Sequence, residues 1–201
     1  MKICISGGCK NGKSGYAQRL AKAQRPVQQA ARRTDSLYYI ATMKSVDAED
    51  DERIARHRRE REGWGFKTIE QPCDIEKILD KCDAGQSFLL DSLTALLANE
   101  MFLPGGNVNE KAAQKITDGL LLITDKIKNI VIVSDYIYSD ALFYDSMTEK
   151  YRESLARIDR AAVENCDVVL EVAYTNVIVH KGKTCEGTIG FPDKSNIRRA
   201  L

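Results

Sequence analysis

The sequence of 201 residues lacks any long apolar run. Stretches such as Phe88–Leu90 and Ile130–Val133 fall far short of the roughly 20 residues that cross a bilayer. The N-terminus also lacks the apolar segment and small-residue cleavage site of a signal peptide. We therefore expect a cytoplasmic protein that does not insert into a membrane.

Excess charge of either sign is missing as well, because 30 Lys and Arg residues face 29 Asp and Glu residues, for a net charge of +1. Without a global field to attract a polyanion, nucleic acid is not an expected partner, and any phosphate must be held locally. The content of 43% apolar and 29% charged residues is typical of a folded domain. We predict one domain over residues 1–181, followed by a loosely ordered C-terminal extension over 182–201.

Cysteine pairs with metal-site spacing are absent. The chain has six cysteines and no C-x-x-C motif, and some of the cysteines lie in apolar, strand-like sequence. We interpret all six as reduced thiols, with neither disulfides nor a zinc site: Cys4, Cys9, Cys73, Cys82, Cys166 and Cys185.

Short β-branched or aromatic segments alternate with longer segments of helical periodicity. The expected strands are Lys2–Ser6, Leu37–Ala41, Phe66–Ile69, Phe88–Leu90, Ile130–Ser134, Val168–Val172 and Val177–His180. The expected helices are Ser14–Gln24, Ala48–Glu62, Ile75–Lys81, Leu93–Phe102, Asn109–Lys128 and Ser146–Asn165. This alternation predicts an α/β fold, with a mostly parallel sheet of about seven strands flanked by helices.

A complete G-x-x-x-x-G-K-S motif directly follows the first expected strand and precedes the first expected helix. Its members are Gly7, Gly8, Cys9, Lys10, Asn11, Gly12, Lys13 and Ser14. In a P-loop of this kind, backbone N–H groups and the helix N-terminus surround a nucleotide polyphosphate. Lys13 would contact the β- and γ-phosphates, and the Ser14 hydroxyl would bind Mg²⁺. The alternative, a glycine-rich turn without a ligand, does not require this strand and helix context.

A P-loop site also needs a carboxylate near the metal, usually at the end of a neighbouring strand. Asp91, directly after Phe88–Leu90, is the candidate. The alternative is structural, since Asp91 and Ser92 also stand where the N-cap of the next helix is expected.

His57 lies among five arginines in the segment after an acidic stretch, Asp47–Glu52. Acidic residues early in a helix and basic residues late in it complement the helix dipole, so one interpretation is a solvent-exposed, self-stabilised helix. The other is catalytic: neighbouring cations suit a triphosphate and favour the neutral imidazole, which can attack phosphorus. A simple kinase needs no such nucleophile, so His57 indicates a second reaction.

Four segments in order resemble one known family, the bifunctional adenosylcobinamide kinases and adenosylcobinamide-phosphate guanylyltransferases of cobalamin biosynthesis. They are the P-loop segment from Ile5 to Ser14, the Tyr39–Thr42 strand end, Asp50 through His57-Arg58 to Gly63-Trp64 and Thr68–Glu70, and Leu89–Thr94 with Asn99. The R-I-x-x-H-R segment followed by G-W and T-x-E is the most specific of these. The resemblance covers Met1 to about Phe102 closely and the second half more weakly.

The resemblance implies a P-loop fold, GTP and ATP as nucleotides, Mg²⁺, and adenosylcobinamide and its phosphate as substrates. It also implies a homotrimer. His57 then carries GMP as a covalent intermediate, and Lys13 assists the phosphoryl transfer. The other implied nucleotide contacts are Thr42, Met43, Lys44, Arg58, Arg59, Glu60, Arg61, Glu70 and Asp91.

One departure separates this chain from the family. Where members usually show N-E-V-G, the sequence has Asp135-Tyr136-Ile137-Tyr138, without the glutamate and the glycine. Two alternatives therefore stay open: a P-loop small-molecule kinase in which His57 is only structural, and a divergent nucleotide-binding paralogue without guanylyltransferase activity. A GTP-dependent switch is disfavoured, because no N-K-x-D motif is present.

Overall fold

The computed structural model describes residues 1–24, 37–138, 140–174 and 176–182, apart from the side chain of Glu60. The expected extension over 182–201 therefore lies almost wholly outside the described residues, as does Cys185. The other five cysteines are free thiols. No helix within the described ranges has the length and apolar character that a membrane span requires.

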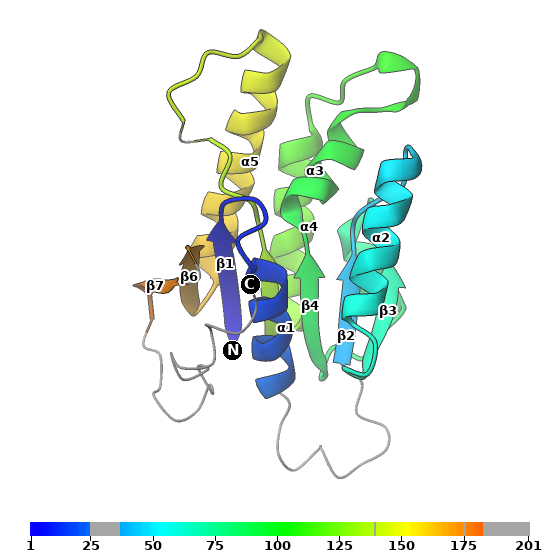
Figure 1. The fold of residues 1–201 in the computed structure, drawn as a ribbon, viewed down its shortest axis with the longest axis vertical. Helices are drawn as coiled ribbons and strands as arrows, with labels where there is room; N and C mark the ends of the chain where they lie inside the picture. The colour runs from blue at the N-terminus through cyan, green and yellow to red at the C-terminus, as the bar shows by residue number, and fades with distance from the viewer. Residues whose placement is uncertain (25–36, 139, 175, 183–201) are drawn as a thin grey trace.

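A seven-stranded sheet forms the centre of the molecule (Figure 1). Its strands are β1 (Lys2–Gly7), β2 (Leu37–Ala41), β3 (Phe66–Glu70), β4 (Ser87–Asp91), β5 (Asn129–Val133), β6 (Val168–Ala173) and β7 (Asn176–Lys181). The order across the sheet is β3-β2-β4-β5-β1-β6-β7, with all pairs parallel except β6 and β7. The predicted mostly parallel α/β sheet is confirmed, and the last two strands form a hairpin.

Helices cover both faces of the sheet (Figure 1). They are α1 (Lys13–Ala23), α2 (Ala48–Glu60), α3 (Leu93–Met101), α4 (Ala112–Lys126) and α5 (Ser146–Asn165), with 3₁₀ turns η1 (Ile75–Asp80) and η2 (Pro104–Gly106). Helices α3, α4 and α5 pack against one another on one face, while α1 and α2 lie on the other. The segment expected as a helix over 75–81 is a 3₁₀ helix over Ile75–Asp80, the tighter geometry found in short connecting pieces.

Side chains that alternate along the strands pack into two apolar cores, one on each face of the sheet. In β1, Cys4 packs toward the face covered by α3, α4 and α5, whereas Ile3 and Ile5 pack toward α1. The buried strands read as continuous apolar segments because both faces of a parallel sheet are covered. This burial fixes the carboxyl ends of β1, β2, β4 and β5 at one edge, which is where ligands bind in such sheets.

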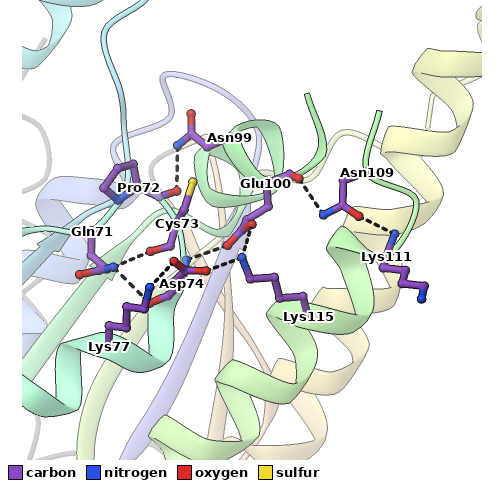
Figure 2. A network of polar contacts seen from close by, with 10 residues as sticks. All are labelled: Gln71, Pro72, Cys73, Asp74, Lys77, Asn99, Glu100, Asn109, Lys111 and Lys115. Atoms are coloured by element: carbon purple, nitrogen blue, oxygen red, sulfur yellow. Dashed lines mark hydrogen bonds and ion pairs between the residues drawn. The ribbon is translucent and has the colours of Figure 1, made fainter. Parts of the chain in front are cut away.

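A charge network around the buried Glu100 ties η1, α3 and α4 together behind that edge (Figure 2). Glu100 is only 5% exposed; one of its oxygens accepts the backbone N–H of Asp74 at 2.7 Å, and the other contacts Lys115 Nζ at 2.7 Å. Lys115 also pairs with Asp74, and Lys77 reaches Asp74 at 2.7 Å. Hydrogen bonds from these two lysines lower the pKa of Asp74 to about 2.

Asn99 connects this region to the strand ends. Its amide donates to the carbonyl of Thr42, after β2, at 2.7 Å. It also donates to the carbonyl of Pro72, after β3, at 3.1 Å, the contact drawn in Figure 2. The two chain segments that leave neighbouring strands are thereby held by one side chain from α3. The backbone segments that follow β2 and β3 are therefore held in a fixed position relative to each other.

Candidate active site

The P-loop motif forms a tight turn between β1 and α1, as its sequence predicts. Gly12 has a positive φ of 89°, and a Cβ at Gly7 would collide with the carbonyl oxygen of Val172 on the neighbouring β6. The amide of Asn11 donates to that same carbonyl oxygen. Glycine is required at position 7 by close approach to β6, while Gly12 supplies the left-handed turn that leads into the helix.

Lys13, the first residue of α1, is buried at the base of this turn. Its ammonium group donates to the Gly8 carbonyl oxygen at 2.7 Å and to the Asp135 carboxylate at 2.8 Å. The side chain therefore lies against the loop whose N–H groups would surround phosphate. This is the position from which a P-loop lysine contacts the β- and γ-phosphates.

Ser14 lies in the first turn of α1, next to Lys13. Among the residues that the structure describes, no cluster of three or more His, Cys, Asp or Glu side chains is arranged to hold a metal ion. Mg²⁺ in nucleotide sites is held by one or two protein ligands together with phosphate oxygens and water. The Ser14 hydroxyl at the helix N-terminus would supply one of those protein ligands.

A second feature, which we call the His57 cleft, lies at the ends of β2 and β4 and has a volume of about 320 Å³. Its walls come from β2, the segment after it, α2, the end of β3 and the β4–α3 junction. The lining residues are Tyr39, Ala41, Met43, Lys44, Ser45, Asp51, Ile54, Ala55, His57, Arg58, Arg61, Thr68, Glu70, Pro72, Asp91 and Ser92. This cleft brings together most of the residues that the resemblance assigned to nucleotide binding.

The polar groups of the cleft are fixed by one another. The Tyr39 hydroxyl donates to Asp91 at 2.8 Å, and the Arg61 guanidinium lies 3.7 Å above the Tyr39 ring. Burial, with the Asp91 carboxylate as a second cause, raises the pKa of Tyr39, so its hydroxyl remains a donor at neutral pH. On the rim, Arg58 pairs with Glu70. The cleft therefore combines a carboxylate, arginines and an imidazole within one polar enclosure.

Helix α2 carries His57 into this cleft and is stabilised by its own charge pattern. Asp47 caps it by accepting the Asp50 N–H at 2.9 Å; acidic residues occupy its first turn and His57, Arg58 and Arg59 its last. The structural interpretation of the sorted charges is correct for helix stability. It does not exclude the catalytic one, because the same helix presents His57 to the cleft.

Two of the predicted contacts, Thr42 and Arg59, are placed differently, and a third is not described. Thr42 is fully buried. Its hydroxyl donates to the Ser92 carbonyl at 2.8 Å and accepts the Ser92 N–H at 2.7 Å, so this side chain links the end of β2 to the end of β4. Arg59 is exposed and does not line the His57 cleft. The Glu60 side chain lies outside the described residues.

The expectation that Asp91 stands on a strand next to the P-loop strand is wrong. Strand β5 lies between β4 and β1, so Asp91 belongs to the His57 cleft. The N-cap of α3 is Ser92, which accepts the Ala95 N–H at 3.3 Å. Asp91 therefore does not cap α3, which was the structural alternative for this residue.

Two residues gained a place in the site that the motifs did not assign. Tyr39 was part of the resemblance but carried no role, and its contact with Asp91 depends on the pairing of β2 with β4. Asp135 reaches Lys13 because β5 is the neighbour of β1. The sequence signal for Asp135 was a polar group just after an apolar strand. Tyr39 lies in the middle of β2, so its only signal was its place in the family motif.

The chain was compared with known proteins. Residues 3–177 match the family described as cobinamide kinase / cobinamide phosphate guanyltransferase. The bifunctional adenosylcobalamin biosynthesis protein CobP of Pseudomonas aeruginosa is 26% identical over 170 residues, which cover 84% of this chain and 91% of that protein.

Solved structures with a related arrangement are more distant. A KaiC-like protein of Pyrococcus horikoshii OT3 aligns with a TM-score of 0.46 and 11% identity, over 90% of this chain and 79% of that one. The P4 protein of bacteriophage phi6, in complex with ADP, aligns with a TM-score of 0.42 and 16% identity, over 88% and 52%. The family match, which spans nearly the whole described fold, is the informative one: this chain belongs to the cobinamide kinase / cobinamide phosphate guanyltransferase family.

Proposed function

We propose that this chain is a bifunctional enzyme of cobalamin biosynthesis, which phosphorylates adenosylcobinamide and transfers GMP from GTP to adenosylcobinamide phosphate. The observation that carries the proposal is the presence of two features at one sheet edge, a P-loop and a separate His57 cleft. A plain kinase needs only the first. A histidine beside arginines and a fixed carboxylate suits a covalent nucleotidyl carrier.

In the kinase step, the aminopropanol hydroxyl of adenosylcobinamide attacks the γ-phosphorus of ATP or GTP. The bond from that phosphorus to the β,γ-bridging oxygen breaks, and the nucleoside diphosphate leaves. Lys13 and the N–H groups of the P-loop neutralise charge on the transferring group. Mg²⁺ bound through Ser14 and the phosphates would supply further charge neutralisation.

In the guanylyl step, an imidazole nitrogen of His57 attacks the α-phosphorus of GTP and pyrophosphate leaves. A phosphate oxygen of adenosylcobinamide phosphate then attacks the same phosphorus, the nitrogen–phosphorus bond breaks, and adenosylcobinamide-GDP forms. Arg58 and Arg61 would bind the phosphates. Splitting one displacement into two is the usual gain of covalent catalysis.

One rival function has an observation in its favour. The Asp47 cap and the sorted charges explain why α2 is stable without any catalytic role for His57. This agrees with a P-loop small-molecule kinase, in which His57 would be only structural. That rival predicts phosphorylation of adenosylcobinamide without any GMP transfer. The divergent paralogue predicts nucleotide binding and neither product.

The test is product analysis by mass spectrometry after incubation with adenosylcobinamide, GTP and Mg²⁺. We expect adenosylcobinamide phosphate and adenosylcobinamide-GDP from the wild type, and only the phosphate from His57→Asn. His180→Asn is the matched control, because His180 lies on β7 and contacts Glu171 at 2.7 Å. The phosphate alone from the wild type would support the kinase rival, and neither product would support the paralogue.

The family resemblance also leads us to propose a homotrimer. A molar mass of three chains by light scattering is the expected result. A monomer at micromolar concentration would contradict it.

A further inference from the structure

Asp135 is held beside the P-loop by its backbone neighbours. It lies two residues beyond β5, the strand that pairs with β1. The N–H of Ser134 donates to Ile5 at 2.9 Å, and the N–H of Tyr136 donates to Gly7 at 3.0 Å. The N–H of Asp135 itself donates to Thr94 Oγ1 at 3.0 Å. Three consecutive N–H groups thus fix this residue against β1 and α3.

The side chain of Asp135 meets the lysine that would bind the γ-phosphate. One carboxylate oxygen is 2.8 Å from Lys13 Nζ, and 28% of the Asp135 side chain is exposed, against 6% for Lys13. Because Lys13 would reach the β- and γ-phosphates, the carboxylate stands on the γ-phosphate side of the P-loop. It is therefore accessible to a group that approaches that phosphorus.

The other carboxylates near this edge have different partners. Asp91 accepts the Tyr39 hydroxyl and Glu70 pairs with Arg58, both at the His57 cleft. Asp140 contacts Arg152 at 2.8 Å, and Asp159 is 5% exposed beneath the edge. Within the described part of the chain, Asp135 is the carboxylate recorded in contact with the P-loop lysine.

We propose that Asp135 is the general base of the phosphoryl transfer; this inference rests on the proposed kinase activity. The proton of the acceptor hydroxyl passes to the Asp135 carboxylate while the hydroxyl oxygen forms its bond to the γ-phosphorus. The electron pair of the breaking phosphorus–oxygen bond leaves with the nucleoside diphosphate. The proton is later released to solvent, so charge and atoms balance.

The guanylyl step does not use this base, because its nucleophiles are the imidazole of His57 and a phosphate oxygen. The two activities should therefore separate in an Asp135 variant. Asp135→Asn keeps the size of the side chain and can still accept a hydrogen bond from Lys13, but it cannot take up the proton. Asp135→Glu restores the carboxylate. Asp118→Asn, on the exposed face of α4, makes the same chemical change away from the site.

The experiment measures three quantities for each variant: the single-turnover rate of adenosylcobinamide phosphorylation, the extent of labelling by α-labelled GTP, and the Kd for GTP. For Asp135→Asn we expect a phosphorylation rate lower by about a hundredfold or more, with labelling and Kd within about threefold of the wild type. Asp135→Glu should recover part of the rate, and Asp118→Asn should match the wild type.

Two results would overturn the assignment of Asp135. One is an Asp135→Asn phosphorylation rate within about threefold of the wild type. The other is a parallel loss of phosphorylation, labelling and GTP binding, which would mean that Asp135 only maintains the P-loop. Failure of the proposed function looks different, because the wild type itself would then phosphorylate no adenosylcobinamide, and the assignment would fall with it.

Discussion

The Tyr39 hydroxyl donates a 2.8 Å hydrogen bond to the Asp91 carboxylate, across the paired strands β2 and β4. The Arg61 guanidinium lies over the Tyr39 ring, 3.7 Å from its centroid. A carboxylate in the His57 cleft is thereby oriented by a neutral donor. These two contacts hold Tyr39 and Asp91 in place in the His57 cleft.

Removal of that hydroxyl in Tyr39→Phe should release Asp91. We expect His57 guanylylation to slow by about tenfold and the free energy of unfolding to fall by about 1–2 kcal/mol, because a buried hydrogen bond to a charged acceptor is lost. Rates of α-labelled GTP incorporation and urea denaturation measure the two effects. Tyr38→Phe is the control, since Tyr38 stacks on Phe88 on the other face of the sheet. Equal rates of α-labelled GTP incorporation in Tyr39→Phe and Tyr38→Phe would show that the orientation of Asp91 does not affect guanylylation.

The two first glycines of the P-loop should differ in their tolerance of a methyl group. In Gly7→Ala the new Cβ would strike the backbone carbonyl of Val172, whereas in Gly8→Ala it meets no atom within 4 Å. We expect Gly7→Ala to lower the free energy of unfolding by about 1–3 kcal/mol and Gly8→Ala to change it by less than about 0.5 kcal/mol. Thermal and urea denaturation decide this. A larger loss in Gly8→Ala would contradict the packing of β1 against β6.

Lys115→Met should destabilise the network around the buried Glu100 (Figure 2). Glu100, 5% exposed, would lose its cation and keep only the N–H of Asp74. We expect a loss of about 1–3 kcal/mol in the free energy of unfolding, because a buried carboxylate is left with less compensation. Lys111→Met, at the exposed start of α4, is the matched control. Similar stabilities of the two variants would show that the network adds little.

Asp159 should make stability depend on pH in an unusual direction. Burial raises the pKa of this carboxyl to about 6, although it accepts the Tyr138 hydroxyl at 3.0 Å. In the unfolded chain an aspartate has a pKa of about 3.9. Between about pH 4 and pH 6 the folded chain therefore binds more protons at this group than the unfolded chain does. The contribution of this group is therefore favourable below about pH 4 and is lost as the pH rises through about 6.

Asp159→Asn removes that cost and keeps an oxygen for Tyr138. Relative to the wild type, we expect the variant to gain about 3 kcal/mol at pH 7 and about 0.5 kcal/mol at pH 4. Urea denaturation at both pH values measures the difference, with Asp118→Asn as an exposed control. An equal change at both pH values would show that the carboxyl does not titrate as its burial implies.

The sequence was sufficient for features that depend on local pattern. Short β-branched or aromatic segments and helical periodicity placed the strands and longer helices within a few residues, and the P-loop was recognised from glycine spacing between a strand and a helix. The charge gradient of α2 identified its dipole stabilisation, and the arginines around His57 marked that histidine as a candidate site residue. These features arise from interactions within one segment, so they are visible before the chain is folded.

Features that depend on strand order were not predictable. Asp91 was assigned to the neighbour of the P-loop strand, but β5 is inserted between them, and this insertion brings Asp135 to Lys13. The role of Thr42 as a link between β2 and β4, and the burial of Glu100, likewise depend on which elements meet. A sequence gives the side chains at strand ends, while the topology decides which of them share a site.

The most direct test of the central claim is incubation of wild type and His57→Ala with α-labelled GTP and Mg²⁺, followed by denaturation in alkali. A phosphorus–nitrogen bond to histidine survives base and breaks in acid. We predict acid-labile label on the wild type, located to His57 by peptide mapping, and none on His57→Ala. Equal labelling of the two proteins, or no label on either while GTP still binds, would contradict the guanylyl-histidine and with it the guanylyltransferase function.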